Sequence, residues 1–200
     1  MNKFPPRIYL ASRSPRRREL LDQIGVAHDV LNTDIDESAL PGETPSSYVL
    51  RIATAKAYTG WQAMLTLGLP RLPVLAADTC VTLDGEIFGK PGNPQVASAM
   101  LRRLSGRSHQ VLTAIALYTG SHCFSAVSTS TVSFRSLDEN DIAHYIASGE
   151  PLDKAGSYAI QGLAAQFICH LDGSYSGVMG LPVFETTQLL EQVWYQRHNN

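Results

Sequence analysis

The sequence has few cysteines, and their placement argues against disulfides and structural zinc. Cys80, Cys123 and Cys169 are the only ones in 200 residues, and no two of them form a C-x-x-C pair. An odd number of isolated cysteines is typical of reduced thiols in a cytoplasmic protein. The six histidines show no H-E-x-x-H or comparable spacing, so a zinc site is not expected.

Long hydrophobic runs are also missing. No apolar stretch approaches the roughly 20 residues that a membrane-spanning helix needs. The first six residues lack the apolar core of a signal peptide. We therefore expect a cytoplasmic protein that has no membrane partner. The chain carries no excess of positive charge either, since its net charge is −2. This value argues against nucleic acid as a partner.

Three common functional motifs come close but fail. Residues 85–91 resemble a P-loop, but the segment is one residue short and lacks the Ser or Thr that holds magnesium. Residues 173–177 have the glycine spacing of a nucleophile elbow, but Tyr175 stands where serine is needed. No dinucleotide fingerprint follows an expected strand. The usual signatures of P-loop hydrolases, serine hydrolases and dinucleotide-binding enzymes are therefore absent.

The composition, by contrast, is ordinary for a soluble globular protein. It is 44% hydrophobic and 17% charged, and we take residues 1–200 as a single domain. Apolar runs and helix-forming stretches alternate, which predicts a mixed α/β fold in two lobes with a cleft between them. The expected strands cover residues 8–11, 27–32, 74–77, 80–83, 86–88, 110–118, 123–134 and 167–171. The expected helices cover residues 15–24, 44–67, 93–105, 136–147 and 182–194.

The first strand and helix predict a site for an anion. The apolar run 8–11 reads as a buried strand, and Ser14 then suits a helix N-cap with Pro15 at the first helical position. Gly25 follows as a C-terminal stop. Free backbone N–H groups, hydroxyls and the arginines of residues 16–18 therefore meet at the end of the strand. Helix N-termini of this kind bind anions.

Helical geometry distinguishes the three arginines. Arg17 falls near the middle of the apolar face of this helix, Arg16 lies at its edge, and Arg18 points towards solvent. A solvated basic helix start is the simpler explanation of such a run. However, positive charge at a helix N-terminus opposes the helix dipole, so we expect a compensating anion nearby.

Two further polar residues sit in apolar surroundings. Lys56 falls on the apolar stripe of the second expected helix, where it either extends to solvent or meets an anion. Asp78 follows the apolar run 74–77, either as a turn residue or as a catalytic group at a strand end. The pair 84–85, Asp-Gly, predicts a tight hairpin that brings Lys90 towards the same region.

These groups form the mixture that a polyphosphate site needs. Cations, hydroxyls and N–H groups hold the negative charge, while carboxylates bind a divalent metal and activate water. The candidates are Ser12, Arg16, Arg17, Lys56 and Lys90, with the carboxylates Glu37 and Asp78. Their spacing in the sequence does not by itself bring them together.

Residues 11–17, Ala-Ser-x-Ser-Pro-Arg-Arg, resemble the opening motif of the Maf family of nucleoside triphosphate pyrophosphatases. The resemblance continues in order at residues 36–37, 48–57, 77–79, 89–91, 104–109, 153–162, 173–175 and 180–182. Arg16, Thr79 and Gln161 together resemble the branch of the family that acts on dTTP and UTP.

The resemblance implies a fold like that of inosine triphosphate pyrophosphatases, with an elongated mixed β-sheet, flanking helices and two lobes around a central cleft. It also implies hydrolysis of the α–β phosphoanhydride to nucleoside monophosphate and pyrophosphate, clearing non-canonical or excess nucleotides. Asp78 would accept the proton, and Mg²⁺ or Mn²⁺ would bind Glu37 and Asp78. The implied phosphate ligands are Ser12, Arg17, Lys56 and Lys90, and the implied selectivity residues are Arg16, Thr79 and Gln161.

Two other functions compete with this one. The chain could be a nucleotide-binding regulator of cell division without significant turnover, or a weak nucleic-acid binder that uses residues 13–18. Retention of both Glu37 and Asp78 favours the enzyme, because a sensor needs no base to activate water. The net charge of −2 counts against nucleic acid. A homodimer is left open.

Overall fold

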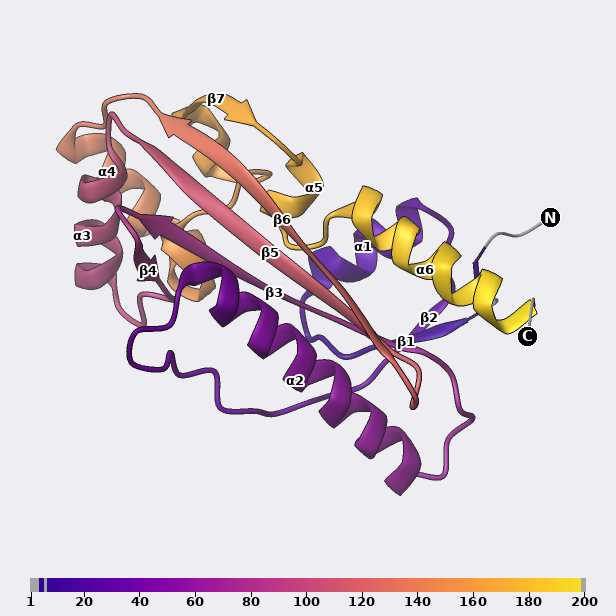
Figure 1. Cartoon of the computed structure of the whole chain (residues 1–200). Helices are drawn as coiled ribbons and strands as arrows, with labels where there is room; N and C mark the ends of the chain where they lie inside the picture. Colours follow the sequence, from indigo (N-terminus) through magenta and orange to yellow (C-terminus); the bar gives the residue numbers. More distant parts are fainter. Residues whose placement is uncertain (1–3, 6, 199–200) are drawn as a thin grey trace.

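The computed structural model describes residues 4–5 and 7–198, with side chains up to residue 195 (Figure 1). The helices are α1 (Pro15–Gln23), α2 (Pro45–Thr66), α3 (Pro94–Leu104), α4 (Glu139–Ala147), α5 (Tyr175–Met179) and α6 (Val183–His198). The strands are β1 (Ile8–Leu10), β2 (His28–Val30), β3 (Val74–Leu83), β4 (Glu86–Phe88), β5 (Ser108–Tyr118), β6 (Cys123–Phe134) and β7 (Ile168–Asp172). Three short 3₁₀ helices, η1 (Glu150–Asp153), η2 (Ala155–Ser157) and η3 (Leu163–Phe167), precede β7.

One mixed sheet runs through the described part of the chain. Its strand order is β2-β1-β3-β5-β6-β7, and β4 pairs with the C-terminal end of β3 on the same side as β1. Strand β1 pairs in parallel with β2 and β3, whereas all the other pairings are antiparallel. The three central strands β3, β5 and β6 have 10, 11 and 12 residues, so the sheet is elongated. The expected mixed α/β fold with an elongated sheet and flanking helices is confirmed.

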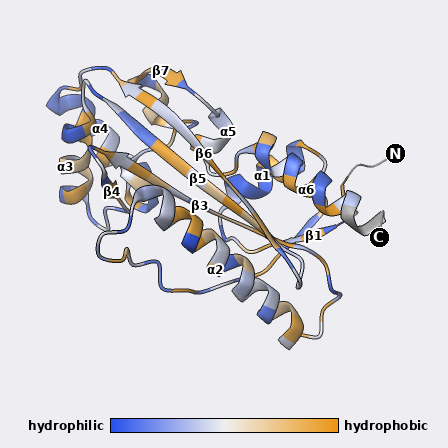
Figure 2. Ribbon diagram, viewed as in Figure 1, coloured by the Kyte–Doolittle hydropathy of each residue, from blue (hydrophilic) through white to orange (hydrophobic). Residues whose placement is uncertain are grey.

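Helices cover both faces of this sheet (Figure 1). Helix α2 lies along one face, and its apolar side chains pack with those of β1, β3 and β5. Helices α1 and α6 pack on the opposite face. Helices α3 and α4 build the far end around a third apolar cluster. No helix in the described ranges is long and apolar enough to cross a membrane. Figure 2 shows α1 as mostly hydrophilic, in keeping with its run of arginines.

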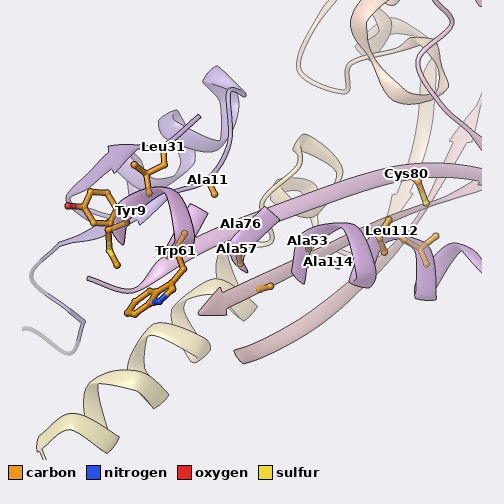
Figure 3. Close-up of a cluster of buried hydrophobic side chains, with 14 residues drawn as sticks. Tyr9, Ala11, Leu31, Ala53, Ala57, Trp61, Ala76, Cys80, Leu112 and Ala114 are labelled. Carbon is orange, nitrogen blue, oxygen red and sulfur yellow. The ribbon is translucent and has the colours of Figure 1, made fainter. Parts of the chain in front are cut away.

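Small side chains let α2 approach the sheet closely. The buried cluster in Figure 3 contains many alanines, including Ala53 and Ala57 of α2 opposite Ala76 and Ala114 of the sheet. A Cβ atom at Gly60 would lie 2.9 Å from the Ala11 side chain. Larger residues here would push the helix outwards, because protein interiors leave no spare room for them.

Most expected elements are present, with three informative differences. Residues 74–83 form one continuous strand rather than two, so Asp78 lies in the middle of β3 and does not close it. Helix α4 begins at Glu139 and not at the expected residue 136, because Asp138 and Asp141 form a capping box there. Ser14 takes the N-cap position of α1, but its side chain makes no capping hydrogen bond.

Candidate active site

A gap along one edge of β3 creates the site. Strand β1 pairs with β3 only near Leu75, and β4 begins to pair at Val81. Between these points β3 has β5 on one side and, among the described residues, no strand on the other. Because successive residues of a strand point to opposite faces, Asp78 projects towards α2 and Thr79 towards α1. At this open edge, side chains from both faces reach one cleft.

The cleft is a cavity of about 1090 Å³. It is lined by the start of α1, the loop before α2, the middle of β3 and the segments around residues 87–90, 153–161 and 178–180. All nine residues singled out in the sequence line it: Ser12, Arg16, Arg17, Glu37, Lys56, Asp78, Thr79, Lys90 and Gln161. Residues that are far apart in the sequence therefore meet in a single cleft between the two ends of the sheet.

Lys56 lies between the two carboxylates of the site. Its Nζ atom is 2.7 Å from Oδ1 of Asp78 and 2.8 Å from Oε1 of Glu37. The Lys56 and Asp78 side chains are only 12% and 9% exposed, whereas that of Glu37 is 46% exposed. Lys56 thus neither extends freely into solvent nor packs as a purely apolar group. Its single positive charge bridges two carboxylates that point into the same cavity.

The two carboxylates differ in proton affinity because their surroundings differ. Burial raises the pKa of Asp78 above its usual range, although Lys56 and Arg17 pull it downwards. Burial would also raise the pKa of Glu37, but the hydrogen bond and charge of Lys56 outweigh it, so this pKa is lowered. Asp78 is therefore the better proton acceptor of the pair, and Glu37 the more persistent anion.

Arg17 is fixed at the start of α1 by three hydrogen bonds. Its Nε donates to the carbonyl of Gly180 at 2.7 Å, Nη1 to Oγ of Ser12 at 3.0 Å, and Nη2 to Oγ1 of Thr79 at 3.4 Å. Burial lowers its pKa despite the nearby carboxylates. Since a guanidinium carries five N–H groups, two donors remain available. Arg18 is exposed, so the expected difference in orientation between these two arginines is confirmed.

Ser12 presents a donor to the cavity. Its Oγ accepts hydrogen bonds from Nη1 of Arg17 at 3.0 Å and from the backbone N–H of Ser14 at 3.2 Å. A serine oxygen has two lone pairs and one proton, and both lone pairs are occupied. The hydroxyl proton of Ser12 is therefore left for an acceptor in the cleft, such as a phosphate oxygen.

A divalent metal fits this donor set. Within the described part of the chain, no three His, Cys, Asp or Glu residues cluster as a ready-made metal cage. Mg²⁺ usually binds through one or two carboxylates together with waters and substrate phosphates. Glu37 and Asp78 supply two such carboxylates. Both lie within 2.8 Å of a single cationic atom, Nζ of Lys56, so the two side chains are close enough together to face one cation.

Some residues of the site were not identified from the sequence. Thr113, on β5, forms a hydrogen bond with Thr79, and Gly180 supplies the carbonyl that holds Arg17. Lys154 lines the cavity with its Nζ bonded to the carbonyl of Glu150 at 2.8 Å. Thr113 stands out in the sequence as a polar residue inside an apolar strand. Its partner Thr79 could not be predicted, because the pairing depends on the register between β3 and β5.

The chain matches a family model, named relatives and a solved structure. The family model described as Maf-like protein matches residues 7–193. A protein of Nitrosomonas europaea named dTTP/UTP pyrophosphatase is 55% identical over 193 residues, which are 92% of this chain and 93% of that protein. A Chromobacterium violaceum protein with the same name is 52% identical over 196 residues, covering 98% and 99% of the two chains. Among solved structures, the Staphylococcus aureus Ham1 protein matches 64% of this chain and 70% of its own at 17% identity and a TM-score of 0.40.

Proposed function

We propose that this chain, which belongs to the Maf-like family, hydrolyses dTTP and UTP to the nucleoside monophosphate and pyrophosphate. The observation that carries the proposal is the cluster of Lys56, Asp78 and Glu37 beside Arg17 in one cavity. The names of the relatives from Nitrosomonas and Chromobacterium support the same substrates.

Binding of the triphosphate is assigned to the start of α1 and the surrounding cations. The hydroxyl of Ser12 and the free N–H groups of Arg17 donate to phosphate oxygens. The N-terminus of α1 adds its positive dipole end. Lys90 reaches the cavity from the segment after β4, and Lys56 approaches from α2. These groups would hold the triphosphate with its α–β bond near Asp78.

Asp78 is the proposed proton acceptor. In hydrolysis of the α–β anhydride, the oxygen of water bonds to phosphorus, the bridging P–O bond breaks, and the proton of water passes to the carboxylate. The raised pKa of Asp78 suits this task, since general-base catalysis improves as the base becomes more basic. Glu37 and Asp78 would hold Mg²⁺ or Mn²⁺, which neutralises phosphate charge and polarises the P–O bonds when bound.

Base selection is assigned to Gln161, Thr79 and Arg16, which line the cavity together. The amide of Gln161 offers both a donor and an acceptor, so it can pair with O4 and N3–H of uracil or thymine. Rotated, it could also pair with cytosine. A pocket shaped for one ring disfavours purines on steric grounds, so we expect dTTP and UTP to be hydrolysed well, CTP less, and ATP and GTP poorly.

A regulator that binds nucleotides without turnover is the competing proposal, and it predicts binding but no product. The cytoplasmic location and the lack of a nucleic-acid partner stay predictions from composition, and a homodimer stays open.

The proposal is tested by initial rates on dTTP, UTP, CTP, ATP and GTP with Mg²⁺, Mn²⁺ or chelator. Asp78→Asn should lower kcat by on the order of 10²–10⁴, because it removes the base. Asp84→Asn is the matched control, since Asp84 lies on the turn after β3 and pairs with Arg107 at the surface. Full activity in chelator would remove the metal from the mechanism. Retention of more than about a tenth of activity by Asp78→Asn would remove its role as base.

A further inference from the structure

Thr113 is a fully buried polar residue with no role in the function proposed above. It lies on β5 directly opposite Thr79 of β3 in the register of the sheet. Its Oγ1 is 2.9 Å from Oγ1 of Thr79 and 2.7 Å from the carbonyl oxygen of Gly177 in α5. The two threonine hydroxyls and this carbonyl thus form a short hydrogen-bonded chain that ends at the cavity.

The direction of the chain follows from the number of protons. A carbonyl oxygen can only accept, so Thr113 donates its single hydroxyl proton to Gly177. Thr113 then has only lone pairs for its neighbour, and Thr79 must donate its own proton to Thr113. The reverse arrangement would place two lone pairs against each other at 2.7 Å between Thr113 and Gly177. Burial makes such an unpaired contact costly.

Thr79 is therefore left with lone pairs on its cavity side. One of them faces Nη2 of Arg17 at the long distance of 3.4 Å, and Thr79 lines the cavity. Ser12, on the other side of the same guanidinium, has the opposite polarity, because its two lone pairs are occupied and its proton is left over. The site thus presents a donor on one side of Arg17 and an acceptor on the other.

We propose that Thr113 is a positioning residue that fixes Thr79 as a hydrogen-bond acceptor, and that Thr79 receives a donor from the nucleoside half of the substrate. This rests on the proposed function. Phosphate oxygens of a metal-bound triphosphate carry no protons at neutral pH, so they cannot serve Thr79. The donors that remain on dTTP and UTP are the ring N3–H and a sugar hydroxyl. If Thr79 accepts from N3–H, the amide of Gln161 pairs with O4 alone; if Thr79 accepts from the sugar hydroxyl, N3–H stays with Gln161. Cytosine has an unprotonated N3 and would meet Thr79 lone pair to lone pair.

Thr113→Val is a suitable perturbation because it removes the hydroxyl while keeping the shape of the side chain. The carbonyl of Gly177 also accepts from the backbone N–H of Gly180 at 3.0 Å, so it keeps one partner in this variant. The hydroxyl of Thr79 then loses its acceptor and becomes free to donate into the cavity. Its preference for a donor on the substrate should relax.

The experiment measures kcat/KM for UTP and CTP, and for dTTP and its 3′-deoxy analogue, in each variant. Calorimetric binding of UMP and CMP provides a readout that needs no turnover. If the donor is N3–H, Thr113→Val lowers the UTP-to-CTP and UMP-to-CMP ratios by about three- to tenfold, the size of one neutral hydrogen bond. If the donor is the sugar hydroxyl, the ratio of dTTP to its 3′-deoxy analogue falls instead.

Matched variants distinguish the loss of the Thr113 hydroxyl from a general disturbance of the fold. Thr113→Ser keeps the hydroxyl and should keep the wild-type ratios. Thr82→Val changes a buried threonine of the neighbouring strand β3, whose hydroxyl has no partner among the described residues, and should also keep them. In the double variant, Thr113→Val should add nothing to the ratio change caused by Thr79→Val, because it acts through Thr79.

The proposal is overturned if Thr113→Val leaves every ratio unchanged or lowers the activity on all substrates equally. A further ratio change in the double variant would also contradict it. If the wild-type protein hydrolyses none of these triphosphates, the proposed function fails. The role of Thr113 is then still decided by binding of UMP against CMP, and of dTMP against its 3′-deoxy analogue, since one of these two ratios must fall in Thr113→Val.

Discussion

Stability should fall steeply below neutral pH because of one buried histidine next to the cavity wall. His109 is 3% exposed and packs edge-on against Phe134 and Tyr158. Its Nε2 lies 2.8 Å from the hydroxyl of Tyr158, a residue that lines the cavity, whereas Nδ1 is buried without a partner among the described residues. A charged imidazolium would leave a buried N–H unpaired here.

The size of the effect follows from the shift in pKa. Burial lowers the pKa of His109 to about 4, against about 6.5 in an unfolded chain. The unfolded chain therefore takes up the proton first as the pH falls, and the stability present above about pH 6.5 is lost towards pH 4. The full shift corresponds to about 3 kcal/mol at 1.36 kcal/mol per pKa unit, of which about 2 kcal/mol is lost by pH 5.

Urea unfolding at pH 7 and pH 5 measures this loss. The variant His109→Gln keeps a polar group for Tyr158 but cannot titrate, so its loss between the two pH values should be smaller than that of the wild type by about 2 kcal/mol. His170→Gln, at an exposed position on β7, is the control and should behave like the wild type. An equal pH dependence in His109→Gln and the wild type would refute the reasoning.

Two further predictions concern the start of α1 and the wall of the cleft. Arg17→Ala should lower kcat/KM by about 10- to 100-fold through lost charge-assisted hydrogen bonds, and the exposed Arg18→Ala should not; equal losses in steady-state assays would count against the assigned orientations. Gly156→Ala should reduce the free energy of unfolding more than Gly149→Ala, because both have positive φ but only the first places a Cβ against Val81, at 2.7 Å. Equal losses in urea titrations would show that Val81 moves aside.

Local sequence signals predicted much of the fold. The Asp84-Gly85 pair makes a two-residue turn with positive φ at both positions, as its residue types require. Thr44 caps α2 through the N–H of Ser47, and Pro45 begins that helix. Such features depend on neighbours within a few residues, so composition and spacing are sufficient to predict them.

The shape of the site depends on long-range pairing that the sequence alone does not reveal. Asp78 was expected to end a strand, because polar residues usually do so after an apolar run. In the structure β3 continues to Leu83, and the cleft exists because β1 stops and β4 begins on either side of Asp78. The bridge from Lys56 to Asp78 and Glu37 likewise depends on how α2 packs on the sheet.

Identification of the products formed from dTTP tests the central claim most directly. Phosphorus NMR of a reaction containing dTTP and Mg²⁺ distinguishes the two routes of hydrolysis in one spectrum. The function proposed here predicts dTMP and pyrophosphate in equal amounts, with neither product formed by Asp78→Asn at a comparable rate. Formation of dTDP and orthophosphate would contradict cleavage at the α–β bond, and an unchanged dTTP signal would contradict the enzyme itself.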